Sequence, residues 1–145
     1  MVEVEIVHAV YARLPNHPGT LERAARALGE HRINVDALSL ETHGGEGYAR
    51  ILTHKAKEAT EALRKAGVEA HVSELAVALL PNAPGELARA CAELAAAGLN
   101  VEGVVTTPGG RLAFRTNDVE TTAQVLRKLG DAAPPAVSGK AAKRR

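Results

Sequence analysis

Aromatic residues are scarce in this 145-residue sequence, which contains two Tyr, one Phe and no Trp. Hydrophobic residues nevertheless make up 46% of the chain, so any core has to be built mainly from Ala, Val, Leu and Ile. Small aliphatic side chains suit thin layers of short helices and strands. The same scarcity removes the stacking platforms on which single-stranded nucleic acids bind, which argues against a nucleic-acid partner.

Cysteine, export signals and long apolar runs are missing as well. Cys91 is the only cysteine, so no intramolecular disulfide can form, as is typical of proteins in reducing compartments. The first residues, MVEVEIV, alternate between apolar and acidic and do not resemble a signal peptide. No apolar run approaches the about 20 residues that a transmembrane helix needs. We therefore expect a cytoplasmic protein that makes no contact with a membrane.

Neither sign of charge dominates, since the formal net charge is +1. Four basic residues and one acidic residue fall in the last 15 positions, which leaves a net charge of −2 on residues 1–130. A weakly acidic body lacks the positive surface that binds phosphates. The last segment, DAAPPAVSGKAAKRR, predicts a flexible basic tail over 131–145, with at most a short strand near Ala136 and Val137.

Two segments of the chain are copies of one another. LPNHPGTLERAARALGEHRINVDA (14–37) and LPNAPGELARACAELAAAGLNVEG (80–103) agree at 11 of 24 positions. The later parts of the copies align at a slightly smaller offset, so the second copy has a hairpin about three residues shorter. A twofold repeat of this length indicates two tandem domains rather than a solenoid. We place them at 1–72 and 73–130.

Each copy predicts a strand, a helix, a hairpin and a second helix. Apolar and acidic residues alternate at the start of the chain, which predicts a strand as far as about Leu14. The apolar residues of the next helix recur with helical spacing and define its inward face: Leu21, Ala24, Ala25 and Leu28, repeated by Leu87, Ala90, Cys91 and Leu94. Further expected elements are a strand from 33, strand 48–53, helix 55–66 and strand 68–72, then strand 74–80, helix 85–97, strands 99–106 and 111–116, and helix 118–129.

This order predicts an α+β fold of two ferredoxin-like βαββαβ units, with antiparallel sheets and helices on one face, paired side by side. Right-handed crossovers place the second strand of each unit at an edge of its sheet. The fourth strand of the second copy has no clear counterpart in its sequence.

The motif Asn-x-Pro-Gly connects the first strand to the first helix in both copies, at 16–19 and 82–85. Pro18 fits the first helical turn because its missing N–H costs nothing there, and Gly19 lets a ligand approach the backbone closely. The free N–H groups of a helix N-terminus attract a carboxylate. The Asn amide both donates and accepts hydrogen bonds, which suits a zwitterionic ligand.

A second Asn follows the first by 18 residues in each copy, within Ile33-Asn34-Val35 and Leu99-Asn100-Val101. A right-handed crossover would bring it near the loop. The alternative is that Asn16 is only a helix N-cap and Asn34 only a turn residue. His17, which is Ala83 in the second copy, is either a ligand contact or an exposed loop imidazole. Cys91 is expected to be a small buried hydrophobe rather than a nucleophile.

The motifs LPNHPGTL with INVDAL, and LPNAPGEL with LNVEGV, resemble the ACT domain, a small regulatory module, over residues 4–129. The order is similar to that of stand-alone tandem ACT proteins, which carry no attached enzyme. The resemblance implies pairing of ACT units through their edges, with an amino acid bound at the seam. It implies a homodimer and allosteric control of an enzyme or a transcription factor.

The serine-binding regulatory domain of phosphoglycerate dehydrogenase places one Asn before Pro-Gly and another on the second strand. The resemblance assigns these roles to Asn16 and Asn34, and to Asn82 and Asn100 in the second copy. That domain also has a His two residues before the loop Asn, where this sequence has Leu14 and Leu80. The difference argues against serine as the ligand. The full set of candidate ligand-binding residues is Asn16, His17, Pro18, Gly19, Asn34, Val35, Asn82, Pro84, Gly85 and Asn100.

The sequence contains no Ser/His/Asp constellation, no phosphate-binding loop and no metal-ligand spacing among its six His. We therefore expect a non-catalytic regulatory protein, without metal or cofactor, that binds a small ligand such as an amino acid. One alternative is an interaction module or regulatory subunit that uses no ligand. A more remote alternative is a small ferredoxin-like enzyme.

Overall fold

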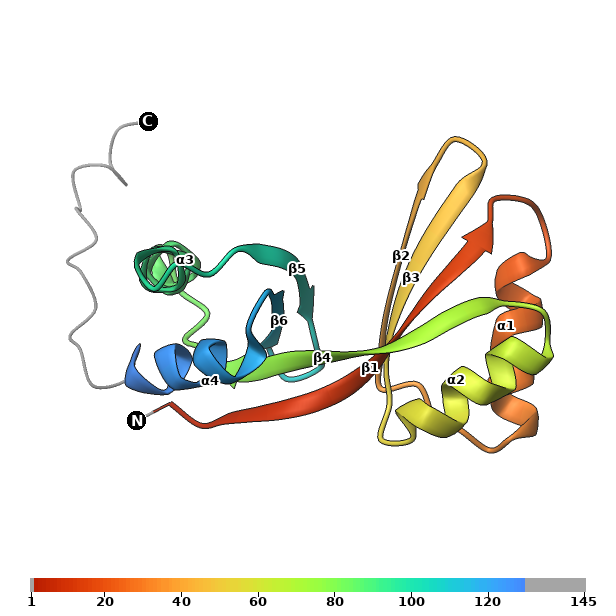
Figure 1. Ribbon diagram of the computed structural model, residues 1–145, viewed down its shortest axis with the longest axis horizontal. Coiled ribbons are helices and arrows are strands. Elements are labelled where there is room, and N and C mark those ends of the chain that lie inside the picture. The colour runs from red at the N-terminus through yellow and green to blue at the C-terminus, as the bar shows by residue number, and fades with distance from the viewer. Residues whose placement is uncertain (1, 130–145) are drawn as a thin grey trace. The chain divides into compact units, whose positions relative to one another are not determined.

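The computed structural model describes residues 2–129, which form six strands and four helices (Figure 1). Most elements begin and end within about two residues of their predicted positions, and the predicted strands 68–72 and 74–80 form one continuous strand, β4. In chain order the elements are β1 (Val4–Pro15), α1 (Thr20–Glu30), β2 (Ala37–His43), β3 (Glu46–Leu52), α2 (Ala56–Lys65), β4 (Glu69–Leu79), α3 (Glu86–Ala96), β5 (Val101–Thr106), β6 (Arg111–Thr116) and α4 (Val119–Lys128).

The chain divides into two compact units. The N-terminal unit is Val7–Leu75, and the C-terminal unit combines, among the described residues, 2–6 with 76–129. Both β1 and β4 therefore contribute residues to both units. The first strand does not belong to one copy of the repeat alone.

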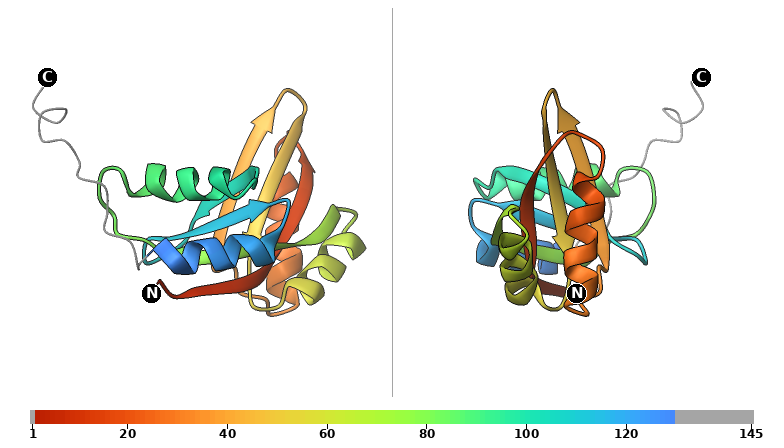
Figure 2. Two further views of the ribbon diagram at one scale, coloured as in Figure 1. Left: turned by 60° about the vertical axis from the view of Figure 1, so that its left-hand side comes forward. Right: turned by 90° about the vertical axis from the view of Figure 1, so that its right-hand side faces the viewer.

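The N-terminal unit has the strand order β2-β3-β1-β4, with β3 antiparallel to both β1 and β2. The predicted edge position of the second strand, β2, is confirmed. Helices α1 and α2 pack beside each other on one face of this sheet (Figure 2). The core between them consists of aliphatic residues, among them Val10, Leu14, Leu28, Ile51 and Leu63.

The C-terminal unit has the order β4-β6-β5, and the start of the chain completes it. Val4 packs in the same core as Ala78 and Phe114, and Val2 and Ile6 lie against this core. The Val2 N–H donates to the Arg127 carbonyl over 3.2 Å, and the Arg127 guanidinium donates to the Val4 carbonyl. Within residues 2–129 no strand follows α4, and the first residues of the chain complete this core instead. The expected tail and the segment near Ala136 lie outside the described residues.

The inward face of the first helix differs from the prediction. Thr20, Ala24, Ala27 and Leu28 are buried on α1, whereas Leu21 and Ala25 are exposed. Both sets have helical spacing, so the pattern alone does not decide which of the two neighbouring stripes meets the sheet. Cys91, at the position equivalent to Ala25, is correspondingly half-buried rather than buried.

Candidate functional site

The loop after β1 is tied to the tip of the β2–β3 hairpin. The Asn16 side-chain amide donates to the Gly44 carbonyl over 2.9 Å, and the Asn16 backbone N–H donates to the Gly45 carbonyl over 2.9 Å. Both bonds hold the loop in place from outside the helix. Asn16 is therefore not the N-cap of α1, which removes the simplest structural explanation of this residue.

A glycine begins each of the two equivalent helices. Gly19 is the N-cap of α1 at φ 90°, and Gly85 is the N-cap of α3 at φ 89°, both in the left-handed region that favours glycine. Pro18 consequently precedes the N-cap instead of lying in the first helical turn as predicted. Neither helix has a side-chain cap. The first N–H group of each helix, on Thr20 or Glu86, donates to the carbonyl of His17 or Ala83, and the next N–H groups of the turn remain able to attract an anion.

The N-terminal unit has a small groove beside this loop. Its volume is about 60 Å³. The His17 Nδ1 atom lies 3.1 Å from the Thr20 hydroxyl and 3.2 Å from the Pro18 carbonyl, so its polar groups bond to one another. The lining residues are Leu14, Pro15, Asn16, His17, Thr20, Leu21, Leu40 and Thr42.

The C-terminal unit repeats the groove with a larger volume, about 240 Å³. Ala83 stands where the first copy has His17. This replacement removes the imidazole that lines the first groove. The lining residues are Leu80, Pro81, Asn82, Ala83, Glu86, Leu87, Thr106, Gly110 and Leu112.

Polar groups in the C-terminal groove are less fully bonded. Within residues 2–129 the Asn82 side chain makes no hydrogen bond, whereas the Asn16 amide donates to the Gly44 carbonyl. The predicted shortening of the second hairpin is wrong, because β2–β3 and β5–β6 span 16 residues each, 37–52 and 101–116. Glu86 is only 9% exposed and forms an ion pair with Arg89, with Oε1 2.9 Å from Nη2. Arg89 also donates to the Leu129 carbonyl over 2.7 Å, which fixes the pair at the end of α4.

The second-strand Asn does not lie near the loop of its own unit. Asn34 donates to Asp36 over 2.8 Å, and Asp36 pairs with His54 at 2.8 Å, next to the end of β3. The hairpin tip that Asn16 contacts is at the other end of β2, roughly 20 Å away at the usual rise of a strand. The predicted proximity within one unit is therefore wrong, since α1 runs the length of the sheet before β2 begins. Val35 is exposed at the same end.

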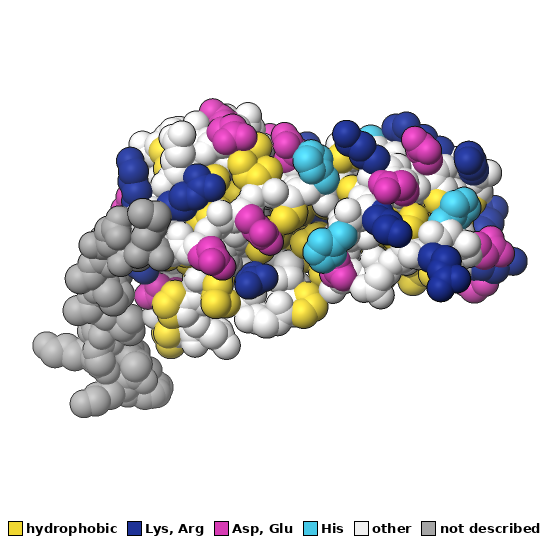
Figure 3. Space-filling model, turned by 90° about the horizontal axis from the view of Figure 1, so that it is seen from below, with side chains coloured by type: hydrophobic (Ala, Val, Ile, Leu, Met, Phe, Trp, Pro, Cys, Tyr) yellow, Lys and Arg dark blue, Asp and Glu magenta, His cyan; other side chains and the backbone are white. Residues whose placement is uncertain are grey.

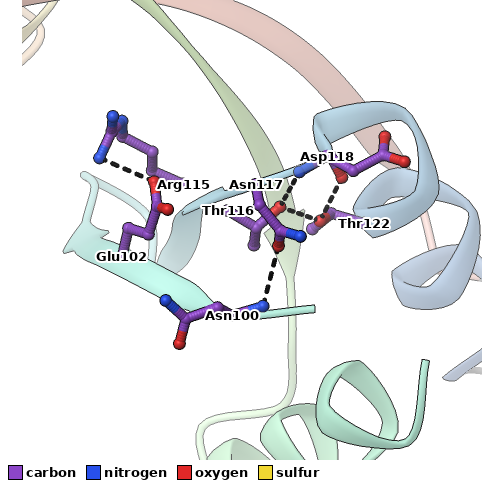
Figure 4. A network of polar contacts seen from close by, with 7 residues as sticks. All are labelled: Asn100, Glu102, Arg115, Thr116, Asn117, Asp118 and Thr122. Atoms are coloured by element: carbon purple, nitrogen blue, oxygen red, sulfur yellow. Dashed lines mark hydrogen bonds and ion pairs between the residues drawn. The ribbon is translucent and has the colours of Figure 1, made fainter. Parts of the chain in front are cut away.

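The C-terminal unit holds its second Asn in a polar network (Figure 4). The Asn100 backbone N–H donates to the Asn117 side-chain oxygen over 2.9 Å, so the Asn100 amide group points away from the network. Next to it, Asp118 caps α4 by accepting from the Thr121 N–H over 3.1 Å. Thr116 and Thr122 share a hydrogen bond of 2.6 Å between their hydroxyls.

Glu86 is the site residue that the sequence prediction missed. It occupies the position of Thr20 in an otherwise matching motif, LPNAPGEL against LPNHPGTL. A buried carboxylate in place of a hydroxyl marks a chemical difference between the copies, and the alignment already contained that signal. The helical spacing predicts Leu21 and Leu87 on the inward helix faces, but both residues line the grooves.

Other chemistries find little support in the described part of the chain. Residues 2–129 contain no group of three or more His, Cys, Asp or Glu placed to hold a metal ion. Basic and acidic side chains are interspersed on the face in Figure 3, which is not the continuous positive surface that phosphates need. None of the described helices is long and apolar enough to cross a bilayer.

Comparison with protein families decides the family of this chain. A family model described as an ACT domain pair matches residues 6–130. The chain belongs to the ACT domain family. The predicted resemblance and the predicted fold of two ferredoxin-like units are thereby confirmed.

Solved structures of similar fold cover most of this ACT domain pair. The ligand-free regulatory subunit of aspartate kinase from Thermus thermophilus has 25% identity and a TM-score of 0.69, covering 90% of this chain and 95% of that one. Protein BT0572 from Bacteroides thetaiotaomicron has 21% identity and a TM-score of 0.77, covering 86% and 89%. The regulatory subunit of aspartate kinase from Thermus flavus has 23% identity and a TM-score of 0.65, covering 88% and 95%. No curated protein sequence matches.

Proposed function

We propose that this ACT domain pair is a non-catalytic, cytoplasmic regulatory protein that binds an amino acid beside its Asn-x-Pro-Gly loops. The observation that carries the proposal is the recurrence of one groove, lined by equivalent residues, in both units. Duplication preserves helix caps, but neither loop Asn is an N-cap here. A groove beside a helix N-terminus that is also lined by an Asn amide suits a zwitterion.

In this proposal the ligand carboxylate lies near the first N–H groups of α1 or α3, next to Gly19 or Gly85. Pro18 and Pro84 hold the chain that leads into these glycines, and the loop side chains bind the remaining polar groups: Asn16, His17 and Asn82. Asn34, Val35 and Asn100 lie too far from the groove of their own unit, so they contact the ligand only if a second chain presents them. The exposed Leu38 and Leu40 on edge strand β2 support such a homodimer.

The proposed partner is an enzyme of amino-acid metabolism, whose activity the bound amino acid controls. The similarity to a regulatory subunit of aspartate kinase at 25% identity supports an enzyme partner. The bound amino acid changes the activity of such a partner only if the regulatory protein binds the amino acid with different affinities in the two states of their complex. A ligand-free interaction module is the second candidate, favoured by the small volume of the N-terminal groove.

Isothermal titration calorimetry with each of the twenty amino acids tests the proposal. We expect saturable binding of at least one of them. We also expect its loss in the double variant Asn16→Ala/Asn82→Ala, whose folding is checked by circular dichroism. A protein that binds none of the twenty would contradict ligand binding and leave the interaction module. Turnover of the bound amino acid would contradict the non-catalytic role.

A further inference from the structure

We infer that the C-terminal groove alone takes the ligand, and that Glu86 selects an α-amino acid with an uncharged aliphatic side chain by accepting its ammonium group. This inference rests on the proposed function. In addition, the ligand occupies the C-terminal groove, Glu86 recognises its ammonium group, and its side chain is aliphatic.

The first difference between the two grooves is their volume. The N-terminal groove measures about 60 Å³, against about 240 Å³ for its equivalent. His17 fills the first groove and is fixed there by its hydrogen bond with Thr20. Ala83 has no side chain that could fill the second groove in this way, so space for a small molecule remains.

The two grooves also differ in the hydrogen bonding of their polar groups. In the first groove the Asn16 amide donates to Gly44, and His17 bonds to Thr20. In the second groove the Asn82 amide and the Glu86 Oε2 atom make no hydrogen bond within residues 2–129. Only the second groove therefore offers both an amide and a carboxylate oxygen to a ligand.

Arg89 orients the Glu86 carboxylate through a hydrogen bond to only one of its two oxygens. The guanidinium binds Oε1 at 2.9 Å and the Leu129 carbonyl at 2.7 Å. A carboxylate accepts several hydrogen bonds, so Oε2 remains available for an ammonium group. A buried carboxylate with one cationic partner gains a second favourable interaction when an ammonium ligand arrives. Arg89 is thus a positioning residue for Glu86.

The rest of the lining restricts the ligand side chain. Leu80, Leu87 and Leu112 form the apolar part of the groove. A charged side-chain end placed against these leucines would lose its hydration without a partner, which costs free energy. An aliphatic side chain gains from the same contact at about 25 cal/mol per Å². The groove therefore favours an amino acid such as valine, leucine or isoleucine over an acidic or basic one.

Calorimetry on the full chain tests the inference with L-valine, L-leucine and L-isoleucine, and with the matching carboxylic acids that lack the amino group. We expect one ligand per chain and about tenfold or weaker binding of the acids, because a hydrogen bond to a charged group is lost. Ala83→His, which copies His17, should abolish binding, and Glu86→Thr, which copies Thr20, should weaken it about tenfold or more. Ala88→His and Glu93→Thr, at exposed positions of α3, are the matched controls and should bind as the wild type does.

Removing Glu86 leaves Arg89 buried without its partner, so Glu86→Thr can also reduce folding stability. Ala83→His disturbs no ion pair and keeps the test valid if Glu86→Thr fails to fold. Two equivalent ligands per chain, or unchanged binding in a folded Ala83→His, would overturn the inference while the proposed function stands. Equal affinity for the deaminated acids would overturn the role of Glu86. A chain that binds none of the twenty amino acids would overturn both.

Discussion

At the scale of single residues, Asp118 shows how one side chain sets a helix start. Of the four described helices, α4 alone begins with a side-chain cap. Hydrogen bonds from the Thr121 hydroxyl and then from the Thr121 N–H hold the pKa of the Asp118 carboxyl below its usual range. The deprotonated form is therefore the one that stabilises the folded state.

Asp118→Asn keeps the shape of the cap but removes its charge. Because the folded-state pKa is lowered, the contribution of the carboxylate is present above the usual aspartate pKa and is lost as the pH falls through the lowered value. We expect the variant to unfold at a lower temperature than the wild type at neutral pH, with the two converging in acid. Thermal denaturation across this pH range measures the effect, and a gap that persists in acid would contradict it.

Two glycines of α1, its N-cap Gly19 and the internal Gly29, allow a second test. A Cβ at either Gly19 or Gly29 would meet no atom within 4 Å, so only the backbone distinguishes them. Gly19 has a φ of 90°, where an L side chain is strained, so Gly19→Ala should destabilise the protein by about 1 kcal/mol. Gly29→Ala, within α1, should stabilise it by about 0.5–1 kcal/mol. Urea denaturation measures both, and equal signs would refute the assignment of strain to Gly19.

At the scale of elements, local sequence patterns predict where each helix and strand lies better than they predict how these elements pack. Strand β6 lies where the alternation placed it, at Arg111–Thr116, and α4 differs by one residue at each end. The exposure of Leu21 depends on how α1 rotates against its sheet, which the sequence of that helix does not determine. The distance between Asn16 and Asn34 depends on the direction in which α1 runs. The motif spacing alone therefore predicts that Asn16 and Asn34 share one site, whereas they lie at opposite ends of the N-terminal unit's sheet.

The first strand provides an element-scale prediction. Val4 is 9% exposed in the C-terminal core. Val4→Ala should destabilise that unit by about 1–2 kcal/mol, because two methyl groups leave the core. Hydrogen exchange should show a loss of protection in α3 and α4, the helices that pack in this core. The exposed neighbour Glu3 supplies the control Glu3→Ala, which should leave protection unchanged, and equal losses in both variants would contradict a packing role.

At the scale of the whole molecule, two strands are common to both units. Because β1 and β4 each continue from one unit into the other, unfolding of one unit frees strand residues that the other requires. The sequence repeat pointed to two self-contained copies, since it shows similarity but not which residues complete which sheet. The signal that the sequence offers for this sharing is that the second copy has no clear counterpart of the fourth strand.

Leu63 and Leu126 occupy equivalent positions in the two cores, and both are fully buried. Each Leu→Ala substitution should cost about 3 kcal/mol. Because of the shared strands, we expect each variant to unfold in one transition at a lower urea concentration, with loss of hydrogen-exchange protection in both units. Two separate transitions, with only one of them shifted by each variant, would show that the units unfold independently.

The C-terminal unit includes residues from the start of the chain, and this has a consequence during synthesis. Val4 leaves the ribosome early, yet its packing partners Phe114 and Leu126 are among the last described residues to be made. At roughly 5–20 residues per second, a further 3–10 s pass between completion of the N-terminal unit and the end of α4. For that interval the apolar side chains of Val2, Val4 and Ile6 have no core to pack against, so nascent chains are open to binding by chaperones or by each other.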